Sequence, residues 1–246
     1  MSRWWYTLLA ALTTALTCQS MVSLADSPID PIYLYATQTG RPTLDQGEGG
    51  GNPFASALVE LLDRQTLAFD AFLTDLVELT QRKSRGFQRP DVSTRVEVED
   101  WQVLPKPDVE RRVALVLVFS DYSASGSAKS LPGAKHDMQR VAKALERAGF
   151  EVQTILDPGR TKVDIALADF ANRSATADVA VVYTTGHGVE IERVIYLLPG
   201  DYPVRQESDA LQERALRLTT LGSALRARRV NLLFYGGCRN NPFRMP

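Results

Sequence analysis

The sequence predicts an α/β fold of three layers, in which helices cover both faces of a mostly parallel sheet. Residues 113–119 form a continuous apolar run, which is typical of a strand that is covered on both faces. Two more apolar runs follow at residues 178–184 and 230–235, and amphipathic helical patterns lie between the three. Strands that alternate with helices indicate βαβ units, whose ligand site lies beyond the carboxyl ends of the strands.

Further elements connect these strands. A helix is expected at residues 133–148 with its stop at Gly149, and residues 150–155 alternate with period two, as in a strand near a sheet edge. Thr161 is expected to cap the next helix, with Asp164 at the capping-box position. The remaining expected elements are a short strand at 194–198, a polar surface loop at 201–214 and a helix from Thr219 or Thr220 to Arg228.

Residues 1–25 have the pattern of a secretory signal. Arg3 precedes an apolar stretch at residues 7–18, and Ser23-Leu24-Ala25 has the small-x-small form of a cleavage site. The stretch is shorter than a membrane-spanning helix requires, so we expect export to the periplasm or the exterior after cleavage. The alternatives are an uncleaved membrane tether and lipidation of Cys18. Once Cys18 is removed, the chain holds a single cysteine and no internal disulfide.

The next segments connect this signal to the α/β region. Residues 26–51 are rich in Pro, Thr, Asp and Gly and are interpreted as a linker. Asn52-Pro53 has the pattern of an N-cap followed by the first helical position, and apolar residues recur at helical spacing across residues 52–86. This pattern predicts one long amphipathic helix that docks on the main domain or on a second copy. Residues 87–110 are interpreted as a connector with a short strand at 94–98.

The composition is that of an ordinary globular protein, with 44% hydrophobic residues and a net charge of −1. This charge does not favour a nucleic-acid partner. The two histidines and the remaining cysteine do not have a metal-ligand spacing, so no metal site is expected. For His136, beside Lys135 and Asp137 in a predicted helix, we expect a solvated or capping role.

Two predicted strands end in residues that carry chemistry, Gly186-His187-Gly188 and Gly236-Gly237-Cys238. If these strands are parallel neighbours, an imidazole faces a thiol, which is the pairing that a cysteine nucleophile needs. The backbone N–H groups of Gly188 and Cys238 are candidates to bind the oxyanion of a tetrahedral intermediate. Arg239 either adds positive charge near the thiolate or binds a carboxylate of the protein.

Simpler interpretations of the same residues exist. A cysteine at a strand end is often a small buried hydrophobic residue, and a Gly-His-Gly sequence can be only a turn. A redox thiol is a third interpretation, but no resolving cysteine accompanies Cys238. The separation of His187 and Cys238 is 51 residues (238 minus 187), close to the roughly 50 expected for a caspase-type histidine upstream of its cysteine.

Residues 111–243 resemble the caspase-like peptidases of bacteria, relatives of metacaspases and caspases in the C14 family. The resemblance implies a three-layer caspase-like fold, with His187 as general base, Cys238 as nucleophile and the backbone of Gly188 as an oxyanion donor. It also implies hydrolysis of a polypeptide substrate through an acyl-enzyme, without a cofactor. Calcium dependence, which occurs among metacaspases, is not expected because the chain shows no acidic cluster for it. The matching segments are residues 112–119 with Tyr122, residues 131–150 with Asp137 and Gly149-Phe150, residues 183–188, residues 196–199 and residues 238–243.

The sequence departs from the family pattern in two respects. Gly236 stands where family members usually carry an aspartate that recognises a basic side chain, and Leu131 does not supply the arginine with which caspases hold an acidic one. The family continues after its nucleophile with strands and helices that complete the sheet, whereas 8 residues (246 minus 238) follow Cys238 here. The last strand is therefore expected to be an exposed edge that pairs with a second copy or a complementary chain.

Two functions follow from this reasoning. The leading prediction is an exported caspase-like cysteine endopeptidase that uses Cys238 and His187. The alternative is a catalytically impaired caspase-like module for binding or regulation, with the long helix or the open strand edge as its contact surface.

Overall fold

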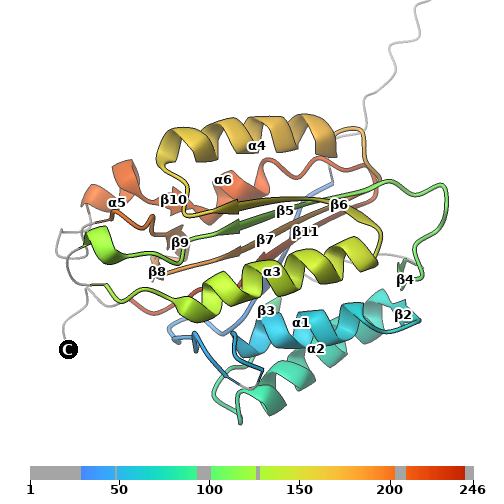
Figure 1. Ribbon diagram of the computed structural model, residues 1–246, viewed down its shortest axis with the longest axis horizontal. Coiled ribbons are helices and arrows are strands. Elements are labelled where there is room, and N and C mark those ends of the chain that lie inside the picture. Colours follow the sequence, from blue (N-terminus) through green and yellow to red (C-terminus); the bar gives the residue numbers. More distant parts are fainter. Residues whose placement is uncertain (1–28, 48, 93–100, 126–127, 203–208, 242–246) are drawn as a thin grey trace, which may run out of the picture.

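The computed structural model describes residues 29–47, 49–92, 101–125, 128–202 and 209–241 (Figure 1). The predicted signal at residues 1–25 and the predicted strand at residues 94–98 lie outside these ranges. Within them, a six-stranded sheet carries helices on both faces, which is the three-layer fold that the sequence predicts. No helix in these ranges is long and apolar enough to cross a membrane.

The sheet has the strand order β3-β1-β11-β7-β5-β6. Neighbouring strands run parallel, except that β3 is antiparallel to β1. Every residue of β5, β7 and β11 is buried, as their continuous apolar runs predict, whereas β6 forms one edge and is partly exposed. The strands are β1 (Ile32–Tyr35), β3 (Asp91–Val92), β5 (Arg112–Val118), β6 (Phe150–Leu156), β7 (Val179–Thr185) and β11 (Val230–Tyr235).

The position of β1 corrects two predictions. The interpretation of residues 26–51 as a linker is wrong, because β1 pairs with β11 in register from Ile32 opposite Leu232 to Tyr35 opposite Tyr235. The last strand is therefore not an exposed edge, and it offers no edge for a partner chain. The places beside β11 that the resemblance assigns to strands after the nucleophile are occupied by β1 and β3.

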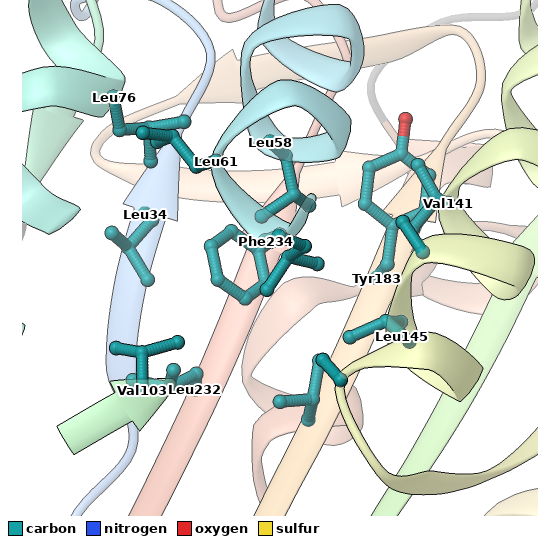
Figure 2. Close-up of a cluster of buried hydrophobic side chains, with 14 of the residues drawn as sticks. Leu34, Leu58, Leu61, Leu76, Val103, Val141, Leu145, Tyr183, Leu232 and Phe234 are labelled. Atoms are coloured by element: carbon teal, nitrogen blue, oxygen red, sulfur yellow. The ribbon is translucent and has the colours of Figure 1, made fainter. Parts of the chain in front are cut away.

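Residues 52–86 form two helices instead of the single long helix that was predicted, α1 (Pro53–Leu62) and α2 (Phe69–Lys83). The chain turns through four polar residues, 63–66, and then forms β2 (Leu67–Ala68), which pairs with β4 (Gln102–Leu104) in the predicted connector. Turning back allows the apolar stripes of both helices to cover the same sheet. Figure 2 shows this layer, in which Leu58 and Leu61 lie near Phe234 of β11 and Leu34 of β1.

The N-terminus of α1 begins as predicted. The side chain of Asn52 accepts a hydrogen bond from the Phe54 N–H at 2.8 Å, and Pro53 occupies the first helical position. The buried residues of α1 and α2 belong to the core beneath the sheet, so their apolar stripes dock on the main domain and are not available to a second copy.

The helix α3 (Pro132–Arg147) covers the same face of the sheet as α1 and α2, and α4 (Arg160–Ser174) and α6 (Leu218–Gly222) cover the opposite face (Figure 1). The helix α3 ends before Gly149 (φ +83°), as predicted. The predicted cap of α4 is wrong, because Gly159 occupies the N-cap and Asp164 pairs with Arg160 instead. The helix α6 is shorter than the predicted span to Arg228.

A small antiparallel sheet lies beyond the carboxyl end of β7, and a short helix follows in the predicted surface loop at 201–214. The central strand of this small sheet is β9, which pairs with β8 on one side and with β10 on the other, both antiparallel. The chain after His187 therefore leaves the main sheet and forms a separate hairpin. The elements are β8 (Gly188–Ile191), β9 (Val194–Leu197), β10 (Leu216–Arg217) and α5 (Asp209–Arg214).

Candidate active site

His187 follows the carboxyl end of β7, where Tyr122 holds both its backbone and its ring. The backbone N–H of His187 donates a hydrogen bond to the Tyr122 hydroxyl at 2.8 Å. The two rings meet edge to face, with their centroids 4.4 Å apart. Tyr122 is itself fixed, because it is buried and its hydroxyl donates to the Leu198 carbonyl at 2.8 Å. The imidazole is therefore held in one position at the rim of the sheet.

The Lys129 backbone determines which nitrogen of His187 is left for chemistry. Nε2 of His187 lies 2.8 Å from the Lys129 carbonyl oxygen. A carbonyl oxygen only accepts hydrogen bonds, so the neutral ring carries its proton on Nε2 and keeps its lone pair on Nδ1. Sequence reasoning missed Lys129, because a main-chain carbonyl acts whatever side chain the residue carries.

Cys238 follows the carboxyl end of β11, which is the neighbour of β7 in the sheet. The Gly236 N–H still donates to the Thr184 carbonyl at 2.9 Å, so the ladder of the two strands continues to this point. The two predicted strand ends therefore share one rim, as the sequence analysis required. The thiol is free and half-buried.

Gly236 has close neighbours that explain why no larger residue stands there. A Cβ on Gly236 would lie 2.8 Å from Oγ1 and 3.0 Å from Cβ of Thr185, and 3.4 Å from the hydroxyl of the buried Tyr183. An aspartate at this position would require these neighbours to shift. The close packing of β7 against β11 therefore disfavours the carboxylate that the family pattern leads one to expect at this position.

The segment that follows β1, residues 37–45, runs along the loop of Cys238, and we name it the strap. The Gly40 N–H donates to the Arg239 carbonyl, and the Arg239 N–H donates to the Arg41 carbonyl, both at 3.0 Å. The Thr43 N–H then donates to Sγ of Cys238 at 3.3 Å, and Thr43 Oγ1 lies 3.5 Å from the same sulfur. Sequence reasoning missed Thr43 because it lies 195 positions away in the predicted linker.

The strap ends beside the N-terminus of α3, and Figure 1 shows the chain after β1 in this region. The carboxylate of Asp45 accepts hydrogen bonds from the N–H groups of Gly133 and Ala134 at 3.0 and 2.9 Å. This is the position where a carboxylate stabilises a helix N-terminus. The strap is therefore anchored on both sides of the thiol, at Arg239 and at α3.

His187 and Cys238 line one small cavity of about 90 Å³ between the strap, the rim of the sheet and α3. Of the predicted oxyanion donors, Gly188 is not in the lining; it is the first residue of β8 and is buried. The Cys238 N–H has no hydrogen-bond acceptor in the ranges that the structure describes. The other lining residues are Thr43, Leu44, Asp45, Asn52, Leu131, Ala134, Thr185, Gly186 and Gly236.

Gly188 allows a close approach of β8 to β11. A Cβ there would overlap the hydroxyl of the buried Tyr235, which donates a hydrogen bond to the Cys238 carbonyl at 3.1 Å.

We expect Gly188→Ala to lower the free energy of unfolding by about 3 kcal/mol, measured by urea denaturation, because overpacking forces a buried side chain to move. Gly159→Ala, where a Cβ meets nothing within 4 Å, should cost less than about 1 kcal/mol. If the overlap is the cause, adding Tyr235→Phe should restore part of the lost stability, and no restoration would contradict it.

Arg239 binds carboxylates of the protein, which is the second of its two predicted roles. Its Nε donates to Glu190 at 2.7 Å and its Nη1 to Asp91 at 2.9 Å, while the guanidinium lies 4.2 Å from the centroid of the Tyr35 ring. The side chains of Arg239 and Glu190 are 7% and 4% exposed. Arg239 directly follows Cys238 in the chain, and it thus contacts β8 through a buried ion pair with Glu190, β3 through Asp91 and β1 through the Tyr35 ring.

Asp137 is the second buried acid near the site, and its side chain is fully buried on α3. Burial raises the pKa of Asp137 to about 7, although the Asn52 N–H (2.7 Å) and Arg140 (3.2 Å) both bond the carboxylate and act in the opposite direction. By contrast, His136, one position earlier, is exposed on α3, which agrees with a solvated side chain.

We expect this acid to make stability depend on pH. Between about pH 4 and pH 7 the folded protein keeps a proton on Asp137 that the unfolded chain releases, so the free energy of unfolding falls as pH rises, by up to about 1.4 kcal/mol per unit. Above pH 7 both states are ionised, and the loss is complete. Asp137→Asn has no such proton, so urea denaturation from pH 4.5 to 8 should show wild type losing stability relative to the variant. Parallel curves would contradict the raised pKa.

The fold and the site define a class of protein: a three-layer α/β protein that presents a thiol and an imidazole at the carboxyl ends of adjacent parallel strands. This is the pairing that a cysteine nucleophile needs. No group of three or more His, Cys, Asp or Glu side chains suited to a metal ion occurs among the residues that the structure describes.

Comparison with protein families identifies this class further. The model of the caspase domain, which defines a family of peptidases, matches residues 111–243, more than half of the chain. The protein belongs to this family, as the resemblance in its sequence predicted. A search of curated proteins finds no match.

Proposed function

We propose that the protein is a cysteine endopeptidase that hydrolyses peptide bonds with Cys238 as nucleophile and His187 as base. One observation supports this most strongly: the thiol and the imidazole line the same cavity, at the ends of neighbouring strands. The caspase-domain family is a family of cysteine peptidases, which makes a polypeptide the expected substrate class.

The proposed reaction begins with proton transfer. Nδ1 of His187 accepts the proton of the thiol, because Nε2 is committed to the Lys129 carbonyl. The thiolate then attacks the carbonyl carbon of the substrate, and the Cys238 N–H donates to the oxyanion that forms. The imidazolium returns its proton to the leaving amine, which leaves a thioester on Cys238. Water, deprotonated by His187, hydrolyses this thioester and releases the second product.

The Thr43 N–H has a role in this scheme. It donates to Sγ in the absence of substrate, and a hydrogen bond to sulfur stabilises the thiolate more than the neutral thiol. The strap thereby supplies part of the polar environment of the proposed nucleophile from the N-terminal side of the chain.

We also propose that the protein is exported. The signal-like pattern of residues 1–25 supports this localisation.

A binding or regulatory module is the second candidate, and one observation favours it. The cavity beside the thiol is only about 90 Å³, and the strap contacts the sulfur directly, so the described conformation leaves little room for a substrate side chain. Peptide hydrolysis therefore requires the strap to move away from the thiol, whereas the function of a binding module does not require this movement.

Peptide turnover decides between these candidates. The full chain would be incubated with a mixed peptide pool, alongside Cys238→Ala and His187→Ala, and new peptide termini would be identified by mass spectrometry. The peptidase hypothesis expects cleavage that both substitutions abolish. No new termini in any sample, from protein that is folded by circular dichroism, would support the binding module.

A further inference from the structure

Asn52, the residue that caps α1, also connects the strap to the end of β11. Its side-chain amide donates one hydrogen bond to the Leu44 carbonyl of the strap at 2.8 Å and another to the Gly236 carbonyl at 3.2 Å. We propose that Asn52 is a positioning residue, which holds the strap against the end of β11 so that the Thr43 N–H stays on Sγ of Cys238. This inference rests on the proposed function and adds to it a residue that acts through its neighbours.

Capping alone does not require an amide side chain. A helix cap needs one oxygen that accepts a backbone N–H, and serine or aspartate supplies it as well as asparagine does. Asn52 uses Oδ1 for this purpose, at 2.8 Å from the Phe54 nitrogen. Its two amide hydrogens are not needed for capping, and they go to the strap and to the rim of the sheet, on two residues that line the small cavity. The residue is 3% exposed, so water competes little for these bonds.

A second buried amide holds the same residue of the strap. Oε1 of Gln88 accepts the Leu44 N–H at 3.0 Å, and Nε2 donates to the Ala36 carbonyl at 3.3 Å, directly after β1. Gln88 is completely buried, and its backbone N–H donates to Oγ of Ser84 at the C-terminus of α2. Both polar backbone groups of Leu44 are therefore fixed by amide side chains, one before α1 and one after α2. We name Asn52 and Gln88 the amide clamp.

The amide clamp acts on both sides of the contact between the strap and the thiol. Leu44 directly follows Thr43, whose N–H donates to Sγ at 3.3 Å. On the other side, Gly236 lies two residues before Cys238; its N–H donates to β7 at 2.9 Å, and its carbonyl accepts from the clamp. Because the clamp fixes the chain beside the donor and beside the acceptor, loosening it should lengthen this contact and remove stabilisation from the thiolate.

The test compares Asn52→Ser with Asn231→Ser, both in the full chain. Serine keeps an oxygen for the cap, but its single hydroxyl hydrogen cannot serve two carbonyls. Asn231 is a matched control, because it is also buried and its amide also donates to two carbonyls, those of Ile29 and Ala227, at 2.9 Å each. It lies at the amino end of β11, away from the thiol. The two variants should lose similar stability, so a difference between them reports on the site.

The first measurement is the pH profile of Cys238 alkylation by iodoacetamide, normalised to its plateau at high pH so that differences in access cancel. We expect the profile of Asn52→Ser to lie about one pH unit higher than that of wild type, because the Thr43 N–H no longer favours the thiolate. The profile of Asn231→Ser should coincide with that of wild type. The other titratable residues that line the small cavity, Asp45 and His187, are unchanged in all three proteins.

The second measurement is peptide turnover. Asn52→Ser should lower kcat about tenfold and leave KM nearly unchanged, because the thiol loses stabilisation while no substrate contact is removed. Asn231→Ser should keep both constants. If Asn52→Ser does not fold, Gln88→Met, which keeps the length of the side chain and loses the bond to the Leu44 N–H, should change the profile and kcat in the same direction.

Three results would overturn the inference: coincident profiles for wild type and the clamp variant, an equal change in Asn231→Ser, or an unchanged kcat in the clamp variant of an active enzyme. The inference and the proposed function fail separately. A profile that moves in Asn52→Ser, without cleavage of any peptide by wild type, would refute the peptidase and keep the amide clamp. Cleavage by wild type with coincident profiles would do the reverse.

Discussion

Replacing Cys238 by serine should lower peptide hydrolysis at least ~1,000-fold and leave the protein folded. The hydroxyl is nearly the same size as the thiol, but it is a much weaker nucleophile when its base has evolved to take a proton from sulfur. Intact-protein mass spectrometry during turnover should detect a thioester on the wild-type chain, since the proposed reaction passes through one, and none on Cys238→Ala.

The control for this prediction is stability. Because Cys238 is half-buried and its sulfur makes hydrogen-bond contacts only with Thr43 in the described structure, Cys238→Ser should shift the free energy of unfolding by less than about 1 kcal/mol. Activity that survives at a tenth of the wild-type rate or more would exclude Cys238 as the nucleophile. A variant that fails to fold would be replaced by Cys238→Ala, with the same expectation for activity.

Removing Glu190 should cost about 3–5 kcal/mol of unfolding free energy, the largest expected effect on stability. Glu190→Ala leaves the guanidinium of Arg239 buried without the acid that its Nε contacts at 2.7 Å. A buried charge that loses its partner keeps its desolvation cost without compensation. Asp91, which is about half exposed, compensates only in part. Urea denaturation measures the loss.

The matched control is Glu78→Ala, which breaks an exposed pair with Arg82 and should cost less than about 1 kcal/mol. Equal losses for the two variants would contradict the importance assigned to burial. Because Arg239 directly follows Cys238, we also expect Glu190→Gln to lower kcat more than it raises KM, since the position of the thiol is disturbed more than the binding of substrate. The loss of kcat separates this role from a purely structural one.

The sequence predicted the part of the fold whose signal is local. Three buried strands were predicted because continuous apolar runs are typical of strands covered on both faces, and β5, β7 and β11 follow those runs closely. The two catalytic candidates were predicted because each follows such a run, in Gly186-His187-Gly188 and in Gly236-Gly237-Cys238. The structure places both on one cavity.

The rest could not be predicted because its causes are not local. The strand β1 has four residues, and only its position beside β11 distinguishes it from a loop. The turn between α1 and α2 depends on the sheet surface that both helices cover. The Thr43 N–H and the Lys129 carbonyl act through the main chain, so no residue type marks them. An acidic helix cap such as Asp45 was likewise hidden, because it caps a helix 88 positions later.

The position of β1 also changes the interpretation of the family resemblance. The matched region, residues 111–243, ends shortly after Cys238, yet the described sheet continues past β11 with β1 and β3 from the N-terminal part of the chain. Residues outside the matched region thus contribute the strap that contacts the thiol. The site is built from both parts, and variants in residues 37–45 belong in any mutational study of it.

The central claim is that the His187 imidazole acts on the Cys238 thiol, and its most direct test is the rate of alkylation of Cys238 by iodoacetamide. The rate would be measured at neutral pH in wild type and in His187→Ala, with His136→Ala as the control for loss of an exposed histidine. We predict that wild type and His136→Ala react at the same rate and that His187→Ala reacts at least about tenfold more slowly. Equal rates in all three proteins would contradict the claim.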